Sequence, residues 1–175
     1  MVIDISQILS VKDKEMILEA DIEMDRFKSR LDDYAFKEKN PVKLELKNKG
    51  KKKFKLTADI DVTLIIPCGR CLKDVEYPMH IKVDKTIDMN ESKNDEDYDA
   101  DDNSFIEESN LDVERLVYKE LLINMPMKVL CSEDCQGISN RCGANLNIQS
   151  CDCDRTELDP RMSKIKDIFN KFKEV

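Results

Sequence analysis

The amino-acid sequence predicts an α+β domain in which a central helix covers an antiparallel sheet, with a barrel-like arrangement of that sheet as one option. Three observations predict this fold class. Apolar and polar residues alternate through much of residues 15–88, as strands with one buried face require. Helical periodicity follows at residues 111–124, and five cysteines lie within residues 131–153. We therefore expect residues 1–130 to form the sheet and its helix, and residues 131–175 to form a Cys-rich metal-binding loop and a basic amphipathic C-terminal helix.

The composition is that of an acidic, highly charged protein. Of its 175 residues 38% are charged, yet 41% are hydrophobic, which is enough for a core, and the formal net charge is −8. Residues 1–5 lack the basic region and long apolar core of a signal peptide, and charged residues interrupt every apolar stretch before it reaches membrane-spanning length. We therefore expect a soluble, cytoplasmic protein without a membrane partner. In that reducing compartment, seven cysteines favour metal ligands or reactive thiols over disulfides.

Taken in order, the first half of the chain predicts a meander of about four strands. A short apolar segment at residues 2–9 precedes an alternating strand at residues 16–24. Pro41 begins a second alternating strand at residues 42–46, and the Asn-Lys-Gly sequence at residues 48–50 supplies turn chemistry after it. Between these strands, three apolar residues recur at helical spacing and predict a short helix or a turn: Phe27, Leu31 and Tyr34.

The longest alternating pattern predicts a β-hairpin over residues 54–83. Its two strands carry apolar residues at every second position, and a segment containing Pro and Gly joins them. The tip holds Cys68 and Cys71 at C-x2-C spacing, which lets two sulfurs bind one metal ion. The alternative is a tight turn in which both cysteines are small apolar fillers.

An acidic loop and a helix follow the hairpin. Residues 90–104 are almost all polar or acidic and show no periodicity, so their composition predicts a disordered loop. Residues 111–124 carry apolar side chains on more than one face, and we expect this helix to be buried against the sheet. Asn110 or Asp112 can cap its N-terminus, and Pro126 ends it.

The C-terminal region contains the second group of cysteines. Five thiols lie close together with two glycines between them: Cys131, Cys135, Cys142, Cys151 and Cys153. A small irregular segment of this kind fits a metal-bound loop, because thiolates bind zinc tightly and a metal can hold a shape that no core supports. With Cys68 and Cys71 the chain offers seven ligands for zinc, whereas one tetrahedral site needs four. Either some thiols are spare or a second site is incomplete; the alternative to both is a set of reduced thiols on a flexible loop.

Charge is distributed unevenly along the chain. Residues 37–55 contain nine lysines against two glutamates, a balance of +7, and residues 88–114 contain twelve acids against one lysine, a balance of −11. The C-terminal helix, expected to start at Asp159 and Pro160, carries a balance of +4 over residues 161–173. Two basic segments on either side of an acidic one suggest a polyanion partner. The candidate nucleic-acid-binding residues are Lys49, Lys51, Lys52, Lys53 and Arg70.

No pattern of catalytic residues is visible. His80 is the single histidine and has no nucleophile near it in the sequence, and the four glycines form no phosphate-binding loop. We therefore expect no enzymatic activity. A thiol-based redox sensor is the main alternative, because Arg70 stands between Cys68 and Cys71 and its charge can lower a thiol pKa.

Short motifs are spread over nearly the whole chain: Cys68-Gly-Arg-Cys71-Leu72, Asn124-Met-Pro126 with Cys131, Cys142-Gly-Ala-Asn-Leu-Asn147, Cys151-Asp-Cys153 and Asp159-Pro-Arg161. Together they resemble the YceD-like family of bacterial and plastid proteins. The resemblance implies a non-enzymatic factor that promotes accumulation of large-subunit ribosomal RNA and binds metal and nucleic acid.

The same resemblance indicates the partners. It implies ribosomal RNA or a pre-ribosomal particle, and an adaptor that binds a basic ribosomal protein through the acidic loop is a further alternative. The chain departs from the family at one position, because Ser139 stands where members of this Cys-rich type usually carry a cysteine. With Ser139 at that position, the chain has seven cysteines, one fewer than two four-thiolate sites require.

Overall fold

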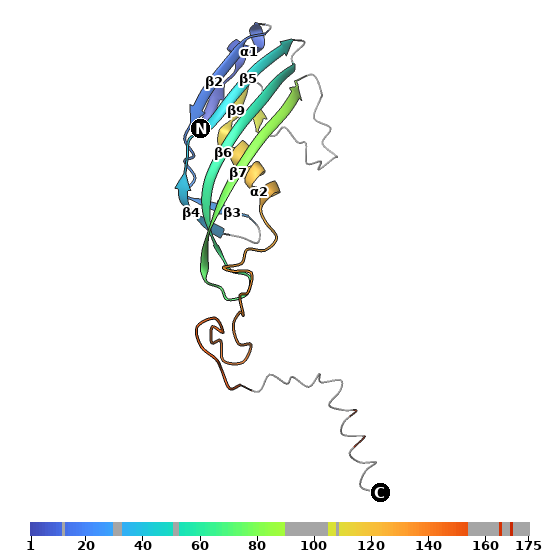
Figure 1. The fold of residues 1–175 in the computed structure, drawn as a ribbon. Coiled ribbons are helices and arrows are strands. Elements are labelled where there is room, and N and C mark those ends of the chain that lie inside the picture. The colour runs from blue at the N-terminus through green and yellow to red at the C-terminus, as the bar shows by residue number, and fades with distance from the viewer. Residues whose placement is uncertain are drawn as a thin grey trace.

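The computed structural model describes residues 1–11, 13–29, 33–50, 53–89, 105–107 and 109–153, together with Ile165 and Phe169 (Figure 1). The architecture is α+β, with antiparallel sheets, few helices and a Cys-rich segment that leaves the sheet beyond the tip of the long hairpin. The described elements are β1 Val2–Asp4, α1 Ser6–Ser10, β2 Glu15–Ala20, β3 Arg26–Lys28, β4 Asp33–Lys39, β5 Val42–Gly50, β6 Lys53–Pro67, β7 Asp74–Asp88, β8 Ile106–Glu107, β9 Asn110–Asp112 and α2 Val113–Asn124.

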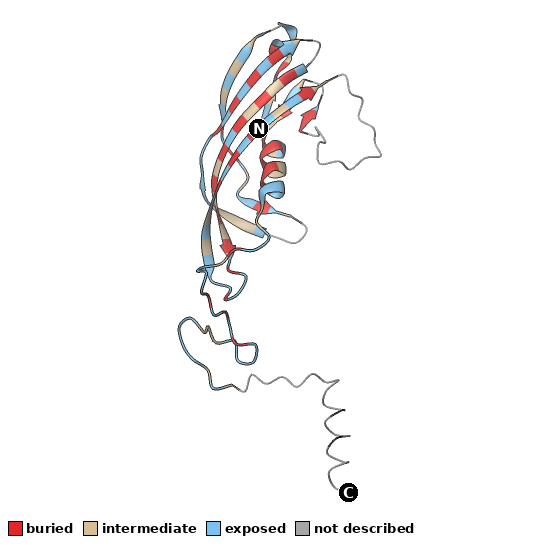
Figure 2. Cartoon of the chain, turned by 45° about the vertical axis from the view of Figure 1, so that its right-hand side comes forward, coloured by how far each residue is buried: buried red, intermediate tan, exposed pale blue. Residues whose placement is uncertain are grey.

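The predicted hairpin is confirmed and forms the centre of the larger sheet. β6 and β7 pair over their full length, from Lys53 opposite Asp88 to Pro67 opposite Asp74. Alternate positions of β6 are buried in the core (Figure 2), and they are the predicted residues Phe54, Leu56, Ala58, Ile60, Val62, Leu64 and Ile66. With 15 residues in each strand, the hairpin is about 50 Å long. Its base and its tip are therefore distant sites.

The larger sheet is open within the described residues, so the barrel-like option is wrong. The strand order is β2-β5-β6-β4-β3, and β7 pairs with β6. Because β7 occupies one whole edge of β6, β5 and β4 share the other edge end to end, opposite residues 53–59 and 62–65 respectively. Because β5 and β4 lie end to end beside β6, together they widen the sheet by one strand position only. A closed barrel needs more strands side by side.

Residues 27–34 were predicted to form a short helix or a turn, and the helix alternative is wrong. Phe27 lies in β3 and Tyr34 in β4, directly opposite each other in an antiparallel pair, while Leu31 falls outside the described residues. A spacing of seven residues suits a tight hairpin as well as a helix, because a turn brings both side chains to one face. The Phe27 ring then packs 5.3 Å from the ring of Tyr118 in α2, and this tertiary contact favours the strands.

The predicted covering helix is confirmed as α2, which starts two residues later than the periodicity indicates. Leu111 instead belongs to β9, in the small sheet β1-β9-β8. Asp112 caps the helix, since its carboxylate accepts the N–H groups of Glu114 and Arg115 at 3.1 and 3.3 Å. The helix lies along one face of the larger sheet (Figures 1 and 2) and shares its core through Val113, Leu116, Val117 and Leu121.

Two predicted segments fall outside the described residues. One is the acidic loop at residues 90–104, and the other is the C-terminal helix apart from Ile165 and Phe169, which are helical and exposed. Among the described helices, none combines the length and the apolar character needed to cross a membrane.

Candidate metal centre

The hairpin tip holds Cys68 and Cys71 on a closed turn. The Cys68 N–H donates to the Lys73 carbonyl at 2.8 Å, and the Cys68 carbonyl accepts the Leu72 N–H at 3.0 Å. Leu72 has a φ of 61°, in the left-handed region that a residue with a branched side chain rarely adopts. Such strain persists only where the surroundings impose it, and here it lies in the turn that leads from Cys71 into β7.

The chain that follows α2 brings Cys131 and Cys135 to this tip. α2 ends at Asn124, and a few residues later the Val129 carbonyl accepts the Gly69 N–H at 2.8 Å. This bond ties the segment before Cys131 to the hairpin turn between Cys68 and Cys71. Two ligand pairs that are more than 55 residues apart in sequence are thereby placed face to face.

Arg70 stabilises the loop of residues 131–135, which carries the second pair of ligands and is called the second ligand loop below. Its Nη1 donates to the carbonyl of Cys135 at 2.9 Å and to that of Glu133 at 3.2 Å. Gly137 packs against the backbone of the same arginine: its φ is 80°, and a Cβ there would lie 3.2 Å from the Arg70 carbonyl oxygen. Glycine suits position 137 because the left-handed φ strains any other residue and an added Cβ would make a tight contact with Arg70.

Four sulfur atoms meet at the tip, each within 4.8 Å of the others: those of Cys68, Cys71, Cys131 and Cys135. The Sγ atoms of Cys68 and Cys135 are 3.9 Å apart, and those of Cys71 and Cys131 are 3.5 Å apart. In a tetrahedral zinc site with Zn–S bonds of about 2.3 Å, the sulfurs are separated by about 3.8 Å. The four thiols therefore fit a tetrahedral ion of this size.

The four-thiol group is largely shielded from solvent and has backbone donors aimed at it. Cys68, Cys71 and Cys135 are buried with Val75 and Leu130 packed against them, whereas Cys131 is exposed. The Cys68 sulfur accepts N–H groups from Cys131 at 3.3 Å and from Arg70 at 3.5 Å. Donors of this kind offset the negative charge of metal-bound thiolates.

The same contacts separate the acidities of the thiols. The pKa of Cys68 is lowered to about 6, chiefly because the Cys71 N–H donates to its sulfur. The pKa of Cys131 is raised to about 12, chiefly by its hydrogen bond with the Cys71 sulfur. The pKa of Cys135 is lowered as well: burial acts to raise it, but hydrogen bonds from Asn147 and Gly137 outweigh that effect. A bound cation would replace the protons that the thiols still carry.

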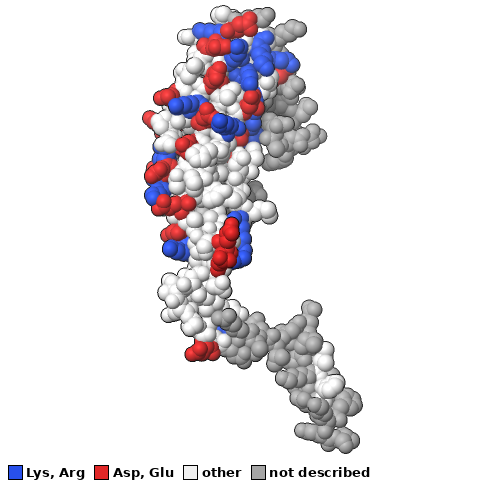
Figure 3. Space-filling view, in the orientation of Figure 1, with Lys and Arg blue, Asp and Glu red and all other residues white. Residues whose placement is uncertain are grey.

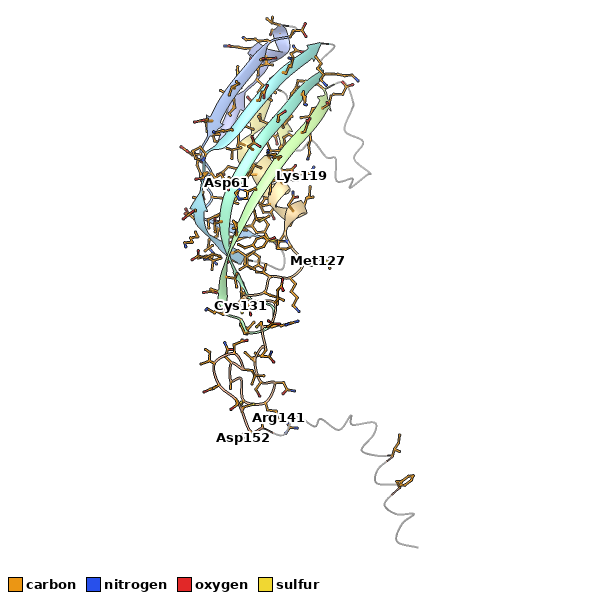
Figure 4. All side chains as sticks on the ribbon, viewed as in Figure 1. Asp61, Lys119, Met127, Cys131, Arg141 and Asp152 are labelled. Carbon is orange, nitrogen blue, oxygen red and sulfur yellow. The ribbon has the colours of Figure 1, made fainter. Side chains whose placement is uncertain are left out.

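The remaining cysteines form a separate group, in which one thiol is exposed and two are half-buried. Figure 4 shows Arg141 and Asp152, which neighbour these thiols in sequence, farther from the sheet than Cys131. The three sulfurs lie within 4.8 Å of one another and belong to Cys142, Cys151 and Cys153. The seven predicted ligands thus divide into a group of four and a group of three.

The described candidates for nucleic-acid binding lie at the two ends of the long hairpin. Lys49 and Lys53 are exposed at the base of the hairpin, and Arg70 lies at its tip. Lys51 and Lys52 lie outside the described residues. The Arg70 guanidinium donates to backbone carbonyls of the second ligand loop, and these contacts are structural.

Cross-strand pairing neutralises much of the basic segment. Strand register sets Lys47 opposite Glu15 and Lys53 opposite Asp88, and other lysines reach acids that are not their register partners. Figure 3 shows blue and red side chains interspersed on the sheet. The pairs are Lys37–Glu76 at 2.5 Å, Lys53–Asp88 at 2.6 Å, Lys55–Asp84 at 2.7 Å, Lys39–Asp25 at 3.8 Å and Lys47–Glu15. The balance of +7 in the sequence therefore does not become a uniformly basic surface.

Sequence reasoning missed the residues that support the ligands. Besides Arg70 and Gly137, Asn147 contributes: its Nδ2 donates to the Cys135 sulfur at 3.4 Å and its Oδ1 accepts the Gln136 N–H at 2.7 Å. Their positions in the sequence could have indicated this supporting role, because Gly137 follows Cys135 by two residues and Asn147 ends the motif that begins with Cys142 and Gly143. Glycine and asparagine in such places indicate tight turns around a metal site.

Comparison with known proteins agrees with these motifs. The model of a family described as "Large ribosomal RNA subunit accumulation protein YceD" matches residues 56–169. The uncharacterised protein YlbN of Bacillus subtilis is 26% identical over 109 residues, which cover 62% of each chain. The uncharacterised protein Rv2926c of Mycobacterium tuberculosis is 21% identical over 114 residues, or 65% of this chain and 55% of that protein. The match thus spans less than two thirds of these relatives, and no solved structure matches.

Proposed function

The chain belongs to the YceD family, and on that premise we propose that it is a non-enzymatic ribosome-biogenesis factor. It promotes accumulation of large-subunit ribosomal RNA by binding that RNA or a ribosomal precursor. The family description supports the rRNA role, and the meeting of four thiols at the hairpin tip supports a structural metal in it.

The metal of this proposal is zinc, held by Cys68, Cys71, Cys131 and Cys135. The ion would supply four strong bonds where the chain has no core, and thereby join the hairpin tip to the Cys-rich segment. The protein's own residues prepare that site: Arg70 orients the second ligand loop, and N–H groups stabilise the charge on the sulfurs.

A thiol redox role is less well supported by the same geometry. A redox pair at the hairpin tip would react as an accessible thiolate, whereas the sulfur of Cys68, whose pKa is lowered to about 6, is fully buried. The donors responsible are backbone N–H groups rather than the charge of Arg70. Thiol reactivity of the purified protein decides between the roles, since metal-bound thiols resist alkylation and a redox pair cycles with an oxidant.

RNA contact in this proposal uses the base of the hairpin, through Lys49 at the end of β5 and the two lysines that follow it in sequence, Lys51 and Lys52. Lys53 is expected to contribute little, because Asp88 already pairs with it. A matched test compares two triple variants of equal charge change, one with Lys49, Lys51 and Lys52 replaced by Gln, the other with Lys37, Lys47 and Lys55. Binding of a large-subunit rRNA transcript to the full chain is measured at several salt concentrations.

We expect the first triple to reduce affinity and to flatten its salt dependence, by about 0.7 to 0.9 in log–log slope for each phosphate that the protein no longer neutralises. The second triple should change both quantities less. Equal effects of the two triples would mean that only net charge matters. No effect of the first triple would exclude this surface.

The cellular role is tested by deleting the gene in its own host and measuring large-subunit against small-subunit ribosomal RNA. The wild-type protein should restore the ratio, and a variant with Cys135 replaced by Ser should not. An unchanged ratio in the deletion strain would refute the proposed role.

A further inference from the structure

The three cysteines that the four-thiol group does not use are gathered by a scaffold of their own. Cys142 lies on a tight loop in which the Gly143 N–H donates to the Ser139 carbonyl at 2.9 Å and the Ser139 N–H donates to the Ala144 carbonyl at 2.8 Å. An isolated bridge pairs Ile138 with Asn145 at the start of this loop. Hydrogen bonds within the protein therefore hold this loop without the help of a metal ion.

This loop is also attached to the first cluster. The Leu146 N–H donates to the Gly137 carbonyl at 2.9 Å, and the Asn147 side chain reaches the Cys135 sulfur at 3.4 Å. From there the chain returns so that the sulfurs of Cys151 and Cys153 lie within 4.8 Å of that of Cys142. Three thiols at this mutual distance match three corners of a thiolate tetrahedron, whose edge is about 3.8 Å for zinc.

Ser139 lies beside Cys142, one of the three ligands. It is buried, with 6% of its surface exposed, and its hydroxyl accepts the N–H groups of Arg141 and Cys142 at 3.4 Å. The same hydroxyl forms a hydrogen bond with the Cys142 side chain. A neutral hydroxyl is a far weaker ligand for zinc than a thiolate, since zinc prefers Cys sulfur, His nitrogen or carboxylate oxygen.

We propose that Cys142, Cys151 and Cys153 form a second site for a thiophilic divalent cation such as Zn²⁺, with three protein thiolates and a fourth position open to an external ligand. In the isolated protein that ligand is water. On binding, the three thiols lose their protons to the solvent, and the cation releases all but one of its water molecules as three sulfurs take their place and its coordination becomes tetrahedral. The resulting centre, with one water retained, carries a net charge of −1.

The two sites are expected to differ in affinity and exchange. Three thiolates bind more weakly than four, and a site with one exposed and two half-buried ligands admits a chelator more readily than the group of four, in which three ligands are buried and Cys131 is exposed. An open position is also the arrangement of zinc sites that take up an exchangeable ligand, whereas structural sites are closed. The second cation should therefore leave first while the first remains bound.

The test uses the full chain with all thiols reduced, titrated with Co²⁺ and with Zn²⁺. We expect two equivalents at saturation, of which one is removed at a chelator concentration at least tenfold lower than the other. Cys153→Ser should abolish the labile equivalent and leave the tight one. Retention of the tight equivalent shows that this variant is folded.

A gain-of-function variant tests the fourth corner. Ser139→Cys should tighten the labile site and move its Co²⁺ absorption to that of a four-thiolate centre, because it places a thiol where the hydroxyl now lies. Asn140→Cys is the matched control, since it adds a thiol at the neighbouring, exposed position. Saturation at one equivalent in the reduced wild type would overturn the proposal, and equal behaviour of the two added thiols would overturn the assignment of the open corner.

Discussion

The two cysteine groups offer the same ligand chemistry on different frameworks. Cys68 and Cys71 stand at the end of two long paired strands, and their partners are tied to that end by Gly69 and Arg70. The group of three stands on one irregular segment, whose described hydrogen bonds form the loop around Cys142. Thiol spacing alone therefore does not make a metal site strong; the rigidity and burial that surround the thiols decide its strength.

The difference in burial and ligand number also suits the two groups to different roles, one structural and one exchangeable. A buried, four-ligand group joins parts of the chain and suits a permanent ion, as structural zinc sites do. An exposed group with an open corner suits an ion that exchanges or takes an additional ligand. Both groups lie at or beyond the hairpin tip, at the opposite end of β6 from Lys49 and Lys53.

The largest effect is expected from Cys135→Ser, which tests whether the two cysteine groups are separate metal sites. It removes a buried ligand from the four-thiol group, and we expect loss of the tightly bound metal together with loss of order in residues 131–153. Structural zinc contributes about 10 kcal/mol or more in small zinc domains, so the decrease in stability of this segment should be several kcal/mol. Metal analysis and thermal unfolding measure it, and Cys142→Ser is the control that should retain the tight ion. Equal metal loss in both variants would contradict the division into two sites.

An intermediate effect is expected from Arg70→Ala. This change deletes hydrogen bonds from a charged donor to the carbonyls of Glu133 and Cys135 while it leaves all seven thiols in place. Removal of such supporting hydrogen bonds lowers metal affinity by about 10- to 100-fold in other metal sites. Competition with a chelator measures the change, and Lys73→Ala, an exposed neighbour, provides the comparison. Unchanged affinity combined with weaker RNA binding would instead support the nucleic-acid role predicted for Arg70.

The smallest effects should come from two glycines, one beside each group. Gly137→Ala adds a Cβ 3.2 Å from the Arg70 carbonyl oxygen at a φ of 80°, whereas Gly143→Ala meets no atom within 4 Å at a φ of 71°. Backbone strain of this kind costs about 1 to 3 kcal/mol, and the steric contact adds to it only at position 137. We expect Gly137→Ala to weaken the tight site and Gly143→Ala to affect the labile site by a smaller amount. Chelator titration of both variants measures this, and a larger effect at position 143 would refute the explanation.

Sequence alone determined the elements whose signal is local. The alternation from Phe54 to Ile66 requires a strand with one buried face, and the structure buries all of those residues. The periodicity near Leu116 and the Asp112 cap likewise predicted α2 to within two residues. The cysteines were recognisable as ligands because thiols at short spacing in an otherwise irregular segment have few other uses.

Only the tertiary structure decided how distant residues combine. Phe27 and Tyr34 became strand partners because α2 offers a ring to pack against, and the charge of Lys53 is paired with Asp88 because the β6–β7 register set them side by side. The division of seven thiols into four and three depends on the bond from Gly69 to Val129 and on the brace from Arg70, which join segments about 60 residues apart. Periodicity and capping act within a few residues and can be read along the chain, whereas register, charge pairing and ligand grouping depend on which segments fold against each other.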